Sequence, residues 1–106
     1  MANEDARTFT GELTTVGRRT GLPRTVELRM ARLDGRFYVS SSGVEGKHWC
    51  RNMLHNSEVQ VRAGGESFAC RARLLNNEDL RRRVLSLRDS PPLLDRVVFE
   101  LTPEKK

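Results

Sequence analysis

The sequence predicts a mainly β protein of the α+β class, a small antiparallel barrel with two short helices inserted between its hairpins. The chain has 106 residues, of which 37% are hydrophobic, enough for one modest core. Most segments rich in valine, threonine and aromatic residues are short and are separated by glycine-containing turns, which is typical of antiparallel strands. Helical periodicity occurs in only two places. About six short antiparallel strands close into a barrel or a sandwich, because closure removes exposed strand edges.

We expect a single domain over residues 1–106, with frayed ends at 1–8 and 103–106. In the segment after Arg24, apolar Val26, Leu28 and Met30 alternate with charged residues, so that one face of this strand is predicted to be buried. Asp34-Gly35 and Gly64-Gly65 are typical of tight hairpin turns. The expected strands cover residues 9–16, 25–33, 36–40, 57–63, 67–75 and 97–101.

The first predicted helix covers residues 47–56, where Trp49 and Met53 are four residues apart and give one apolar face. The second begins at a cap provided by Asn76 or Asn77, and the Ser-Pro-Pro sequence at 90–92 ends it. We expect its buried stripe to consist of Leu80, Val84 and Leu87. We expect its arginines to face the solvent, namely Arg81, Arg82, Arg83 and Arg88.

Arginine dominates the positive charge of the chain. There are 19 Lys and Arg against 14 Asp and Glu, the net charge is +5, and the only lysines are Lys47, Lys105 and Lys106. Arginine recognises phosphate and carboxylate groups in a planar, bidentate way that lysine cannot, which favours an anionic ligand. A compositional bias of the genome is the alternative explanation. Nucleic-acid binding is not favoured, because acidic residues are interspersed and only 6% of residues are aromatic.

The two cysteines and the distribution of apolar residues indicate a cytoplasmic protein. Cys50 and Cys70 are twenty residues apart and belong to no Cys-x-x-Cys pair, so two reduced thiols are expected. The first ten residues are polar and acidic, unlike a signal peptide, and no run of about 18 apolar residues is present to span a membrane. No metal site is expected, because His48 and His55 have no partners at metal-ligand spacing.

The segment Gly17-Arg18-Arg19-Thr20-Gly21, followed by Arg24, is the most informative in the chain. It lies between two predicted strands and therefore predicts a tight loop. The arginines and the threonine hydroxyl offer charge-assisted hydrogen bonds, and glycine permits a close approach of the backbone to a ligand. The segment indicates a phosphate or polycarboxylate site, and the alternative is a solvated basic turn.

A second candidate segment, Ser40-Ser41-Ser42-Gly43, follows a predicted strand and leads toward a predicted helix. Its small side chains would let a flat ring lie against the backbone, although an ordinary connection has the same composition. Trp49 is interpreted as a core residue rather than a stacking platform. No Ser-His-Asp arrangement, Walker loop or Gly-x-Gly-x-x-Gly motif is present, and the catalytic residues stay unknown.

In order along the chain, these segments resemble the deazaflavin-dependent nitroreductase family, within the flavin/deazaflavin oxidoreductases of split β-barrel, FMN-binding-like fold. The motif Thr-Thr-x-Gly-Arg-(Lys/Arg)-(Ser/Thr)-Gly-x-x-Arg is matched by residues 14–24. The strand that ends in small residues and glycine is matched by residues 38–43. The pattern Trp-x-x-Asn-Leu-x-x-Asn-Pro-x-Val is matched by Trp49, Asn52, Met53, Asn56 and Val59. The resemblance covers residues 13–75 and extends to the last strand.

The resemblance implies a six-stranded antiparallel split barrel that binds coenzyme F-420, a deazaflavin with a phosphate and a polyglutamate tail. It implies that Arg18, Arg19 and Arg24 hold the phosphate or the tail. Together with the loop interpretation, Thr20 and Gly21 complete this anion site. The ring would be bordered by Ser40, Ser41, Ser42 and Gly43, and flanked by Lys47 and Trp49. The implied reaction moves a hydride between the reduced deazaflavin and a small organic acceptor such as a quinone, a nitroaromatic or an enone.

Two other functions stay open at this point. An FMN-binding split-barrel flavoprotein would use the same arginines for the FMN phosphate. A non-catalytic protein could store or carry the cofactor, or a degenerate barrel could only dimerise. We expect a homodimer and a small-molecule acceptor as partners, and neither nucleic acid nor a transmembrane segment.

Overall fold

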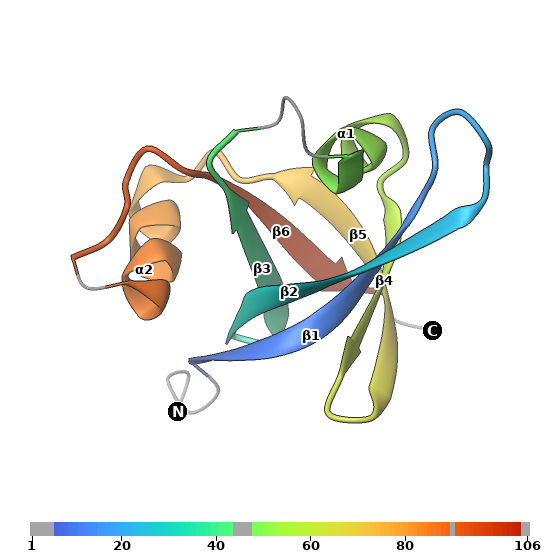
Figure 1. Ribbon diagram of the computed structural model, residues 1–106. Helices are drawn as coiled ribbons and strands as arrows, with labels where there is room; N and C mark the ends of the chain where they lie inside the picture. Colours follow the sequence, from blue (N-terminus) through green and yellow to red (C-terminus); the bar gives the residue numbers. More distant parts are fainter. Residues whose placement is uncertain (1–5, 44–47, 90, 105–106) are drawn as a thin grey trace.

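The computed structural model describes residues 6–43, 48–89 and 91–104, which form a closed antiparallel barrel with two helices (Figure 1). Around the barrel the strands follow the order β1-β2-β3-β6-β5-β4, and pairing of β4 with β1 closes it. The mainly β barrel with two helical insertions is therefore confirmed. The elements are β1 (Arg7–Val16), β2 (Pro23–Leu33), β3 (Arg36–Ser41), α1 (His48–His55), β4 (Glu58–Ala63), β5 (Glu66–Leu74), α2 (Glu78–Arg88) and β6 (Val97–Pro103).

The barrel uses more of the chain than the sequence indicated. β1 begins at Arg7 and β6 ends at Pro103. Residues 7, 8 and 103 therefore belong to the barrel rather than to the frayed ends expected at 1–8 and 103–106. The backbone N–H of Glu104 also donates to the Ala69 carbonyl at 2.8 Å. β2 begins at Pro23 rather than at residue 25, because its pairing with β1 continues through Thr15↔Arg24 to the end of that strand.

Alternation along the strands separates the barrel interior from its outer face. In β3, Phe37 and Val39 point into the barrel and pack with Met30, Leu13 and Leu101 in one cluster. Tyr38, between them, belongs to a different cluster outside the barrel. Alternating apolar residues thus fill the interior from every strand, as the period of two predicts.

Helix α2 covers part of the outer face with the second apolar cluster. Asn77 caps its N-terminus by accepting a hydrogen bond from the Leu80 N–H at 3.1 Å, as expected. Val84 of the predicted stripe is fully buried, and Leu80 and Leu87 are partly buried and pack against the same cluster. The predicted stripe is therefore confirmed, and the structure adds Leu85, which is also fully buried.

Two of the four helix arginines do not face the solvent, although the sequence predicted that they would. The side chain of Arg81 is only 18% exposed and donates to the Arg96 carbonyl as well as to Glu78. Arg88 is half-buried and donates to the hydroxyl of Ser40 on β3. Burial, followed by repulsion from Arg96 and Arg29 and opposed by Asp89, lowers the pKa of Arg88. Long arginine stems cover apolar surface while their charged ends reach neighbouring oxygens.

Helix α1 lies across one end of the barrel, next to the loop that joins β1 to β2 (Figure 1). Its residues Cys50 and Met53 enter the interior cluster, and Trp49 packs against the edge of that cluster. This packing closes the end of the barrel and fixes the helix beside the arginine-containing loop.

Candidate functional site

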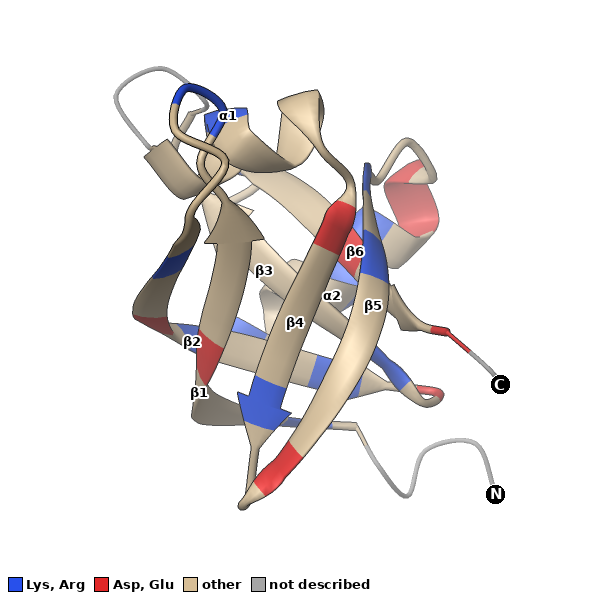
Figure 2. Ribbon diagram, turned by 90° about the vertical axis from the view of Figure 1, so that its right-hand side faces the viewer, with Lys and Arg blue, Asp and Glu red and all other residues tan. Residues whose placement is uncertain are grey.

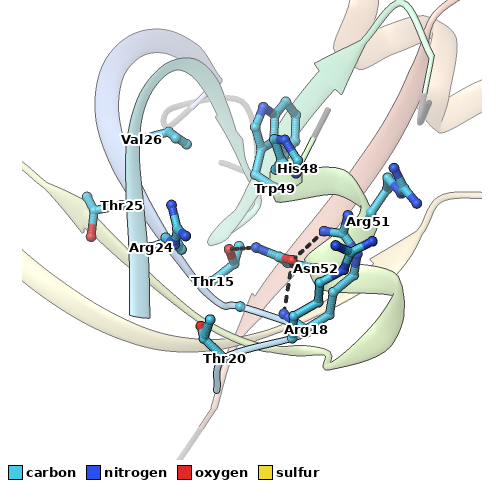
Figure 3. A pocket seen from close by; sticks show the side chains of 12 residues that line it. Thr15, Arg18, Thr20, Arg24, Thr25, Val26, His48, Trp49, Arg51 and Asn52 are labelled. Atoms are coloured by element: carbon cyan, nitrogen blue, oxygen red, sulfur yellow. Dashed lines mark hydrogen bonds between the residues drawn. The ribbon is translucent and has the colours of Figure 1, made fainter. Parts of the chain in front are cut away.

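A pocket of about 640 Å³ lies between the β1–β2 loop and helix α1 (Figure 3). Its volume is in the range of small-molecule and cofactor sites. We call it the arginine pocket. It is lined by Thr15, Gly17, Arg18, Arg19, Thr20, Arg24, Thr25, Val26, His48, Trp49, Arg51 and Asn52. Residues from two strands, one loop and one helix therefore meet in the place where the sequence predicted an anion site.

The loop is held in a compact shape by its own hydrogen bonds. The Gly17 N–H donates to the Leu22 carbonyl and the Gly21 N–H donates to the Gly17 carbonyl, each at 2.8 Å. The Leu22 N–H donates to the Thr20 hydroxyl at 3.2 Å. Gly21 has φ +73°, and a Cβ on Gly17 would lie 2.9 Å from the Thr20 hydroxyl oxygen. Both glycines are thus required by the backbone of the loop itself.

Asn52 joins the loop to helix α1. Its side-chain oxygen accepts hydrogen bonds from the Arg18 guanidinium at 3.0 Å and from the Arg18 backbone N–H at 3.3 Å. Its amide nitrogen donates to the hydroxyl of Thr15 at 3.0 Å. Asn52 and Thr15 are both buried, and Figure 3 shows the three side chains in contact. The buried amide of Asn52 therefore holds both the backbone and the guanidinium of Arg18 at the pocket wall.

The arginine pocket is strongly cationic. Four of its twelve lining residues are arginines and none is acidic (Figure 2 shows the positive tip of the β1–β2 loop beside α1). Desolvation, followed by repulsion from Arg51 and Arg19, lowers the pKa of Arg18. Like charges gathered without a carboxylate among them attract anions, and an anion bound there would relieve their repulsion.

The other wall of the pocket is less polar. Trp49 is partly exposed to the pocket while it packs against the barrel interior, so it is both a core residue and a lining residue. Val26 adds an apolar surface from β2. His48 is exposed and lines the pocket. A ligand with one anionic end and one flat apolar end matches this division.

The structure brings only some of the predicted site residues to the pocket. Arg18, Arg19, Thr20, Arg24 and Trp49 line it. Arg24 lies on β2 rather than in the loop, paired with Thr15. Gly21 shapes the loop without lining the pocket, and the prediction for Lys47 lies outside the described residues.

The segment from Ser40 to Gly43 does not line the arginine pocket. The Ser40 side chain is on the outer face of the barrel, where it bonds Arg88. The Ser41 hydroxyl is buried and pairs with the backbone of Gly43. Ser42 is exposed.

Several lining residues were not predicted. The sequence had placed Asn52 in a family pattern without giving it a role, and it had not singled out Arg51. The remaining residues are Thr15, Thr25, Val26 and His48. A helical wheel places Asn52 three residues after Trp49, on the same side of α1. That spacing was the available signal, but only the docking of α1 against the loop shows that this side faces the arginines.

A second polar cluster occupies the outer face of the barrel. We call it the Glu100 cluster, and it consists of Arg36, Tyr38, Arg73 and Glu100. The Glu100 carboxylate is 2% exposed and accepts hydrogen bonds from the Tyr38 hydroxyl and from Arg73 Nε, each at 3.0 Å. Arg36 lies 3.8 Å from the same carboxylate. Burial, followed by the charge of Glu100, raises the pKa of Tyr38 to about 12.

Comparison with known proteins agrees with the fold and identifies the family. The family model described as F420H(2)-dependent quinone reductase matches residues 5–93 of this chain. That match includes the arginine loop, the serine-containing strand end and helix α1. No curated protein sequence matches this chain.

Solved structures are similar over most of the chain. One is an F420-H2 dependent reductase (FDR-A), with 26% identity and a TM-score of 0.70, covering 87% of this chain and 92% of that chain. A structure described as a domain-swapped dimer has 25% identity and a TM-score of 0.71, covering 87% and 78%. The heme storage protein HutZ from Vibrio cholerae shares the fold alone. Its identity is 19% and its TM-score is 0.70, and the match covers 99% of this chain and 86% of that chain.

In the described part of this chain, no helix is long and apolar enough to cross a membrane.

Proposed function

This chain belongs to the F420H(2)-dependent quinone reductase family, and we propose that its arginine pocket binds the phosphate and the acidic tail of coenzyme F-420. Its activity is that of an F-420-dependent oxidoreductase, a deazaflavin reductase in the split-barrel fold. When bound, the reduced cofactor supplies a hydride to a small organic acceptor. The protein contributes binding, orientation and the exclusion of water.

The observation that carries the proposal is the acid-free group of four arginines around a glycine-bounded loop. A phosphate followed by several carboxylates needs more than one cation, and this pocket offers Arg18, Arg19, Arg24 and Arg51. Arginine can bind each anionic group with two parallel hydrogen bonds. The Gly17–Gly21 loop contains no acidic residue that would compete for the arginines. The chemistry of these donors therefore matches an elongated polyanion better than a neutral ligand.

We propose that the deazaflavin ring lies against Trp49 and extends toward the end of β3. The support is the apolar wall made by Trp49 and Val26, beside the cationic one. Ser41, Ser42 and Gly43 would border the ring there. The hydroxyl of Ser40 is engaged by Arg88 on the outer face, so its proposed contact is confined to its backbone.

The proposed acceptor is a quinone, with nitroaromatics and enones as alternatives of similar size and polarity. The description of the matching family supports the quinone. No protonating side chain is assigned. Tyr38 is engaged by Glu100 on the outer face of the barrel and does not line the arginine pocket.

A homodimer in the cytoplasm completes the proposal. The similarity to a structure described as a domain-swapped dimer supports dimerisation, and a domain of about 100 residues gains stability by covering apolar surface. A measurement of molar mass in solution by light scattering, repeated over a tenfold dilution, tests the dimer.

The experiment that tests the cofactor is a parallel titration with F-420 and with FMN, followed by quenching of tryptophan fluorescence. Trp49 is the only tryptophan and lines the pocket, so quenching reports occupancy of this site directly. We expect micromolar or tighter binding of F-420 and much weaker binding of FMN. Preference for FMN identifies a flavoprotein, and tight binding of F-420 without turnover of any acceptor identifies a carrier. Binding of neither cofactor contradicts the proposal.

A further inference from the structure

We propose that Asn52 is a positioning residue that holds the Arg18 guanidinium in the arginine pocket, so that the phosphate and tail of the cofactor meet a preformed site. The inference rests on the proposed function and adds a residue that the anion motif of the loop does not contain. Asn52 belongs to helix α1, thirty-four residues away in the sequence from the arginine that it holds. Figure 3 shows it between Thr15 and Arg18, with its bonds to both drawn as dashed lines.

The hydrogen bonds of Asn52 leave little freedom in its orientation. Arginine carries only donors, so the amide oxygen of Asn52 must face Arg18 and the amide nitrogen must face the hydroxyl of Thr15. The oxygen accepts both the backbone N–H and the guanidinium of Arg18, at 3.3 and 3.0 Å. Both acceptor positions of the amide oxygen are then used by Arg18, whereas Thr15 uses only one of the two amide N–H donors. The proposal is that Asn52 acts on the ligand through Arg18, and the double variant described below separates this role from direct donation to the ligand.

Arg18 needs such a tether because its neighbours repel it. The guanidinium groups of Arg19 and Arg51 are close enough to disfavour its charged form, and the pocket has no carboxylate to compensate. An untethered arginine would turn toward solvent and would have to be ordered again at each binding event. A side chain that is already fixed loses less conformational entropy when the ligand binds.

Asn52 also links the two halves of the proposed site. Trp49 and Asn52 are three residues apart on α1, so their side chains lie on neighbouring positions of one helix face. Trp49 provides the flat apolar wall and Asn52 fixes the first cation of the anion loop. The distance between the ring subsite and the anion subsite is thus set by one rigid turn of helix. This arrangement favours ligands that carry a flat ring and an anionic extension at a fixed separation.

The test compares two ligands on three single variants. The ligands are F-420 and the same deazaflavin with its ribityl chain but without phosphate and tail. The variants are Asn52→Ala, Arg18→Ala and the control Asn56→Ala. Asn56 is a matched control because it also accepts a backbone hydrogen bond, from the Glu58 N–H at 3.0 Å, but does not line the pocket. Binding is measured by quenching of Trp49 fluorescence, and each variant is melted thermally to confirm that it folds.

We expect Asn52→Ala to weaken F-420 binding about tenfold, as loss of a hydrogen bond to a charged group would, while the tail-free ligand binds as before. Arg18→Ala should weaken F-420 binding at least as much. Adding Asn52→Ala to Arg18→Ala should cause little further loss, because Asn52 acts on the ligand only through Arg18. A residue that served only the fold would reduce binding of both ligands equally and would show no such dependence on Arg18.

A second variant keeps the inference testable if Asn52→Ala does not fold. Asn52→Leu has a similar size but offers no acceptor to Arg18. We expect it to fold and to bind F-420 more weakly, with unchanged binding of the tail-free ligand. Native F-420 affinity in Asn52→Leu, or in a folded Asn52→Ala, overturns the positioning role. If Arg18→Ala also leaves F-420 binding unchanged, the proposed location of the cofactor itself is wrong.

Discussion

The arginine pocket and the Glu100 cluster use the same residue type in opposite ways. In the Glu100 cluster, Arg36 and Arg73 converge on one buried carboxylate that also accepts from Tyr38. In the arginine pocket, Arg18 is repelled by its neighbours and no lining residue is acidic. The first group has its counter-charge built into the fold. The second has positive charge that no lining residue neutralises, which is the arrangement expected of a ligand site.

This comparison separates stability from binding. A carboxylate that is 2% exposed must keep its hydrogen-bond partners, because a buried polar group without a partner costs free energy of folding. Removing pocket arginines that have no carboxylate partner there should cost little free energy of unfolding. Changes in the Glu100 cluster should therefore affect unfolding and spare the cofactor, whereas changes in the arginine pocket should do the reverse.

The largest effect on stability is expected for Glu100→Ala. The change leaves the hydroxyl of Tyr38, a residue only 2% exposed, without its acceptor. We expect the free energy of unfolding to fall by about 3 kcal/mol, measured by urea denaturation. The control is Glu58→Ala. The Glu58 side chain is 70% exposed, and its ion pair with Arg71 is a loose surface contact at 3.8 Å. This substitution should change stability by less than about 0.5 kcal/mol. An equal loss in both variants would contradict the assigned role of the Glu100 cluster.

The largest effect on binding is expected for the double variant Arg18→Ala/Arg19→Ala. Two charge-assisted contacts to the cofactor are lost, so F-420 binding should weaken about 50-fold, measured by quenching of Trp49 fluorescence. The control is Arg82→Ala/Arg83→Ala, which removes two exposed arginines from α2 and leaves the net charge equal to that of the test variant. If both double variants lose the same affinity, overall charge rather than the pocket attracts the cofactor.

A smaller effect separates two glycines in equivalent conformations. Gly21 in the β1–β2 loop and Gly64 in the β4–β5 hairpin have φ +73° and +59°, and a Cβ on either would meet nothing within 4 Å. Replacing either with alanine should therefore lower stability by about 1 kcal/mol through backbone strain alone. Only Gly21→Ala should also weaken F-420 binding, because only that loop carries the arginines. Unchanged F-420 affinity in Gly21→Ala would show that the loop shape does not matter for binding.

The smallest effect concerns alkaline pH. Burial and the charge of Glu100 raise the pKa of Tyr38 from 10.0 to about 12, which means that folding favours the neutral phenol. Its contribution to stability is therefore complete below pH 10 and is lost as the pH rises toward 12. Tyr38 is the only tyrosine, so the ultraviolet absorbance of tyrosinate reports its titration directly. A midpoint near pH 10 in the folded protein would contradict the buried Tyr38–Glu100 bond.

The buried thiol of Cys70 should also lower the free energy of unfolding at alkaline pH. Burial, followed by the charge of Glu104, raises the pKa of Cys70 from 9.0 to about 12. The free energy of unfolding should thus decline above pH 9 even in Tyr38→Phe, and more steeply in the unchanged protein. Unfolding at several pH values, with and without Tyr38→Phe, separates the two contributions.

Much of the fold could be predicted because its signals are local. Asp34 and Gly35 both adopt positive φ, 54° and 77°, as the hairpin dipeptide requires, and Gly64-Gly65 does the same at the second turn. The alternation at Val26, Leu28 and Met30 was enough to identify the buried face of β2. Asn77 caps its helix as expected. Each of these depends on neighbouring residues in the chain, so the sequence pattern carries the information.

The anion loop was also visible in the sequence, since its glycines and arginines are contiguous. By contrast, Arg51 and Asn52 join the pocket only because α1 docks against that loop, and no local pattern specifies this contact. The engagement of the Ser40 hydroxyl was equally invisible in the sequence, because only the packing of α2 on the barrel brings Arg88 to it.

The strands, the turns, the cationic loop and the family could be identified from the order of residues along the chain. Which arginines have carboxylate partners became visible only in the folded structure. That distinction depends on contacts between residues far apart in the chain, such as Tyr38 with Glu100 and Arg18 with Asn52. Charge counts along a sequence cannot reveal it, because the energy of a charge depends on its burial and on its neighbours in space.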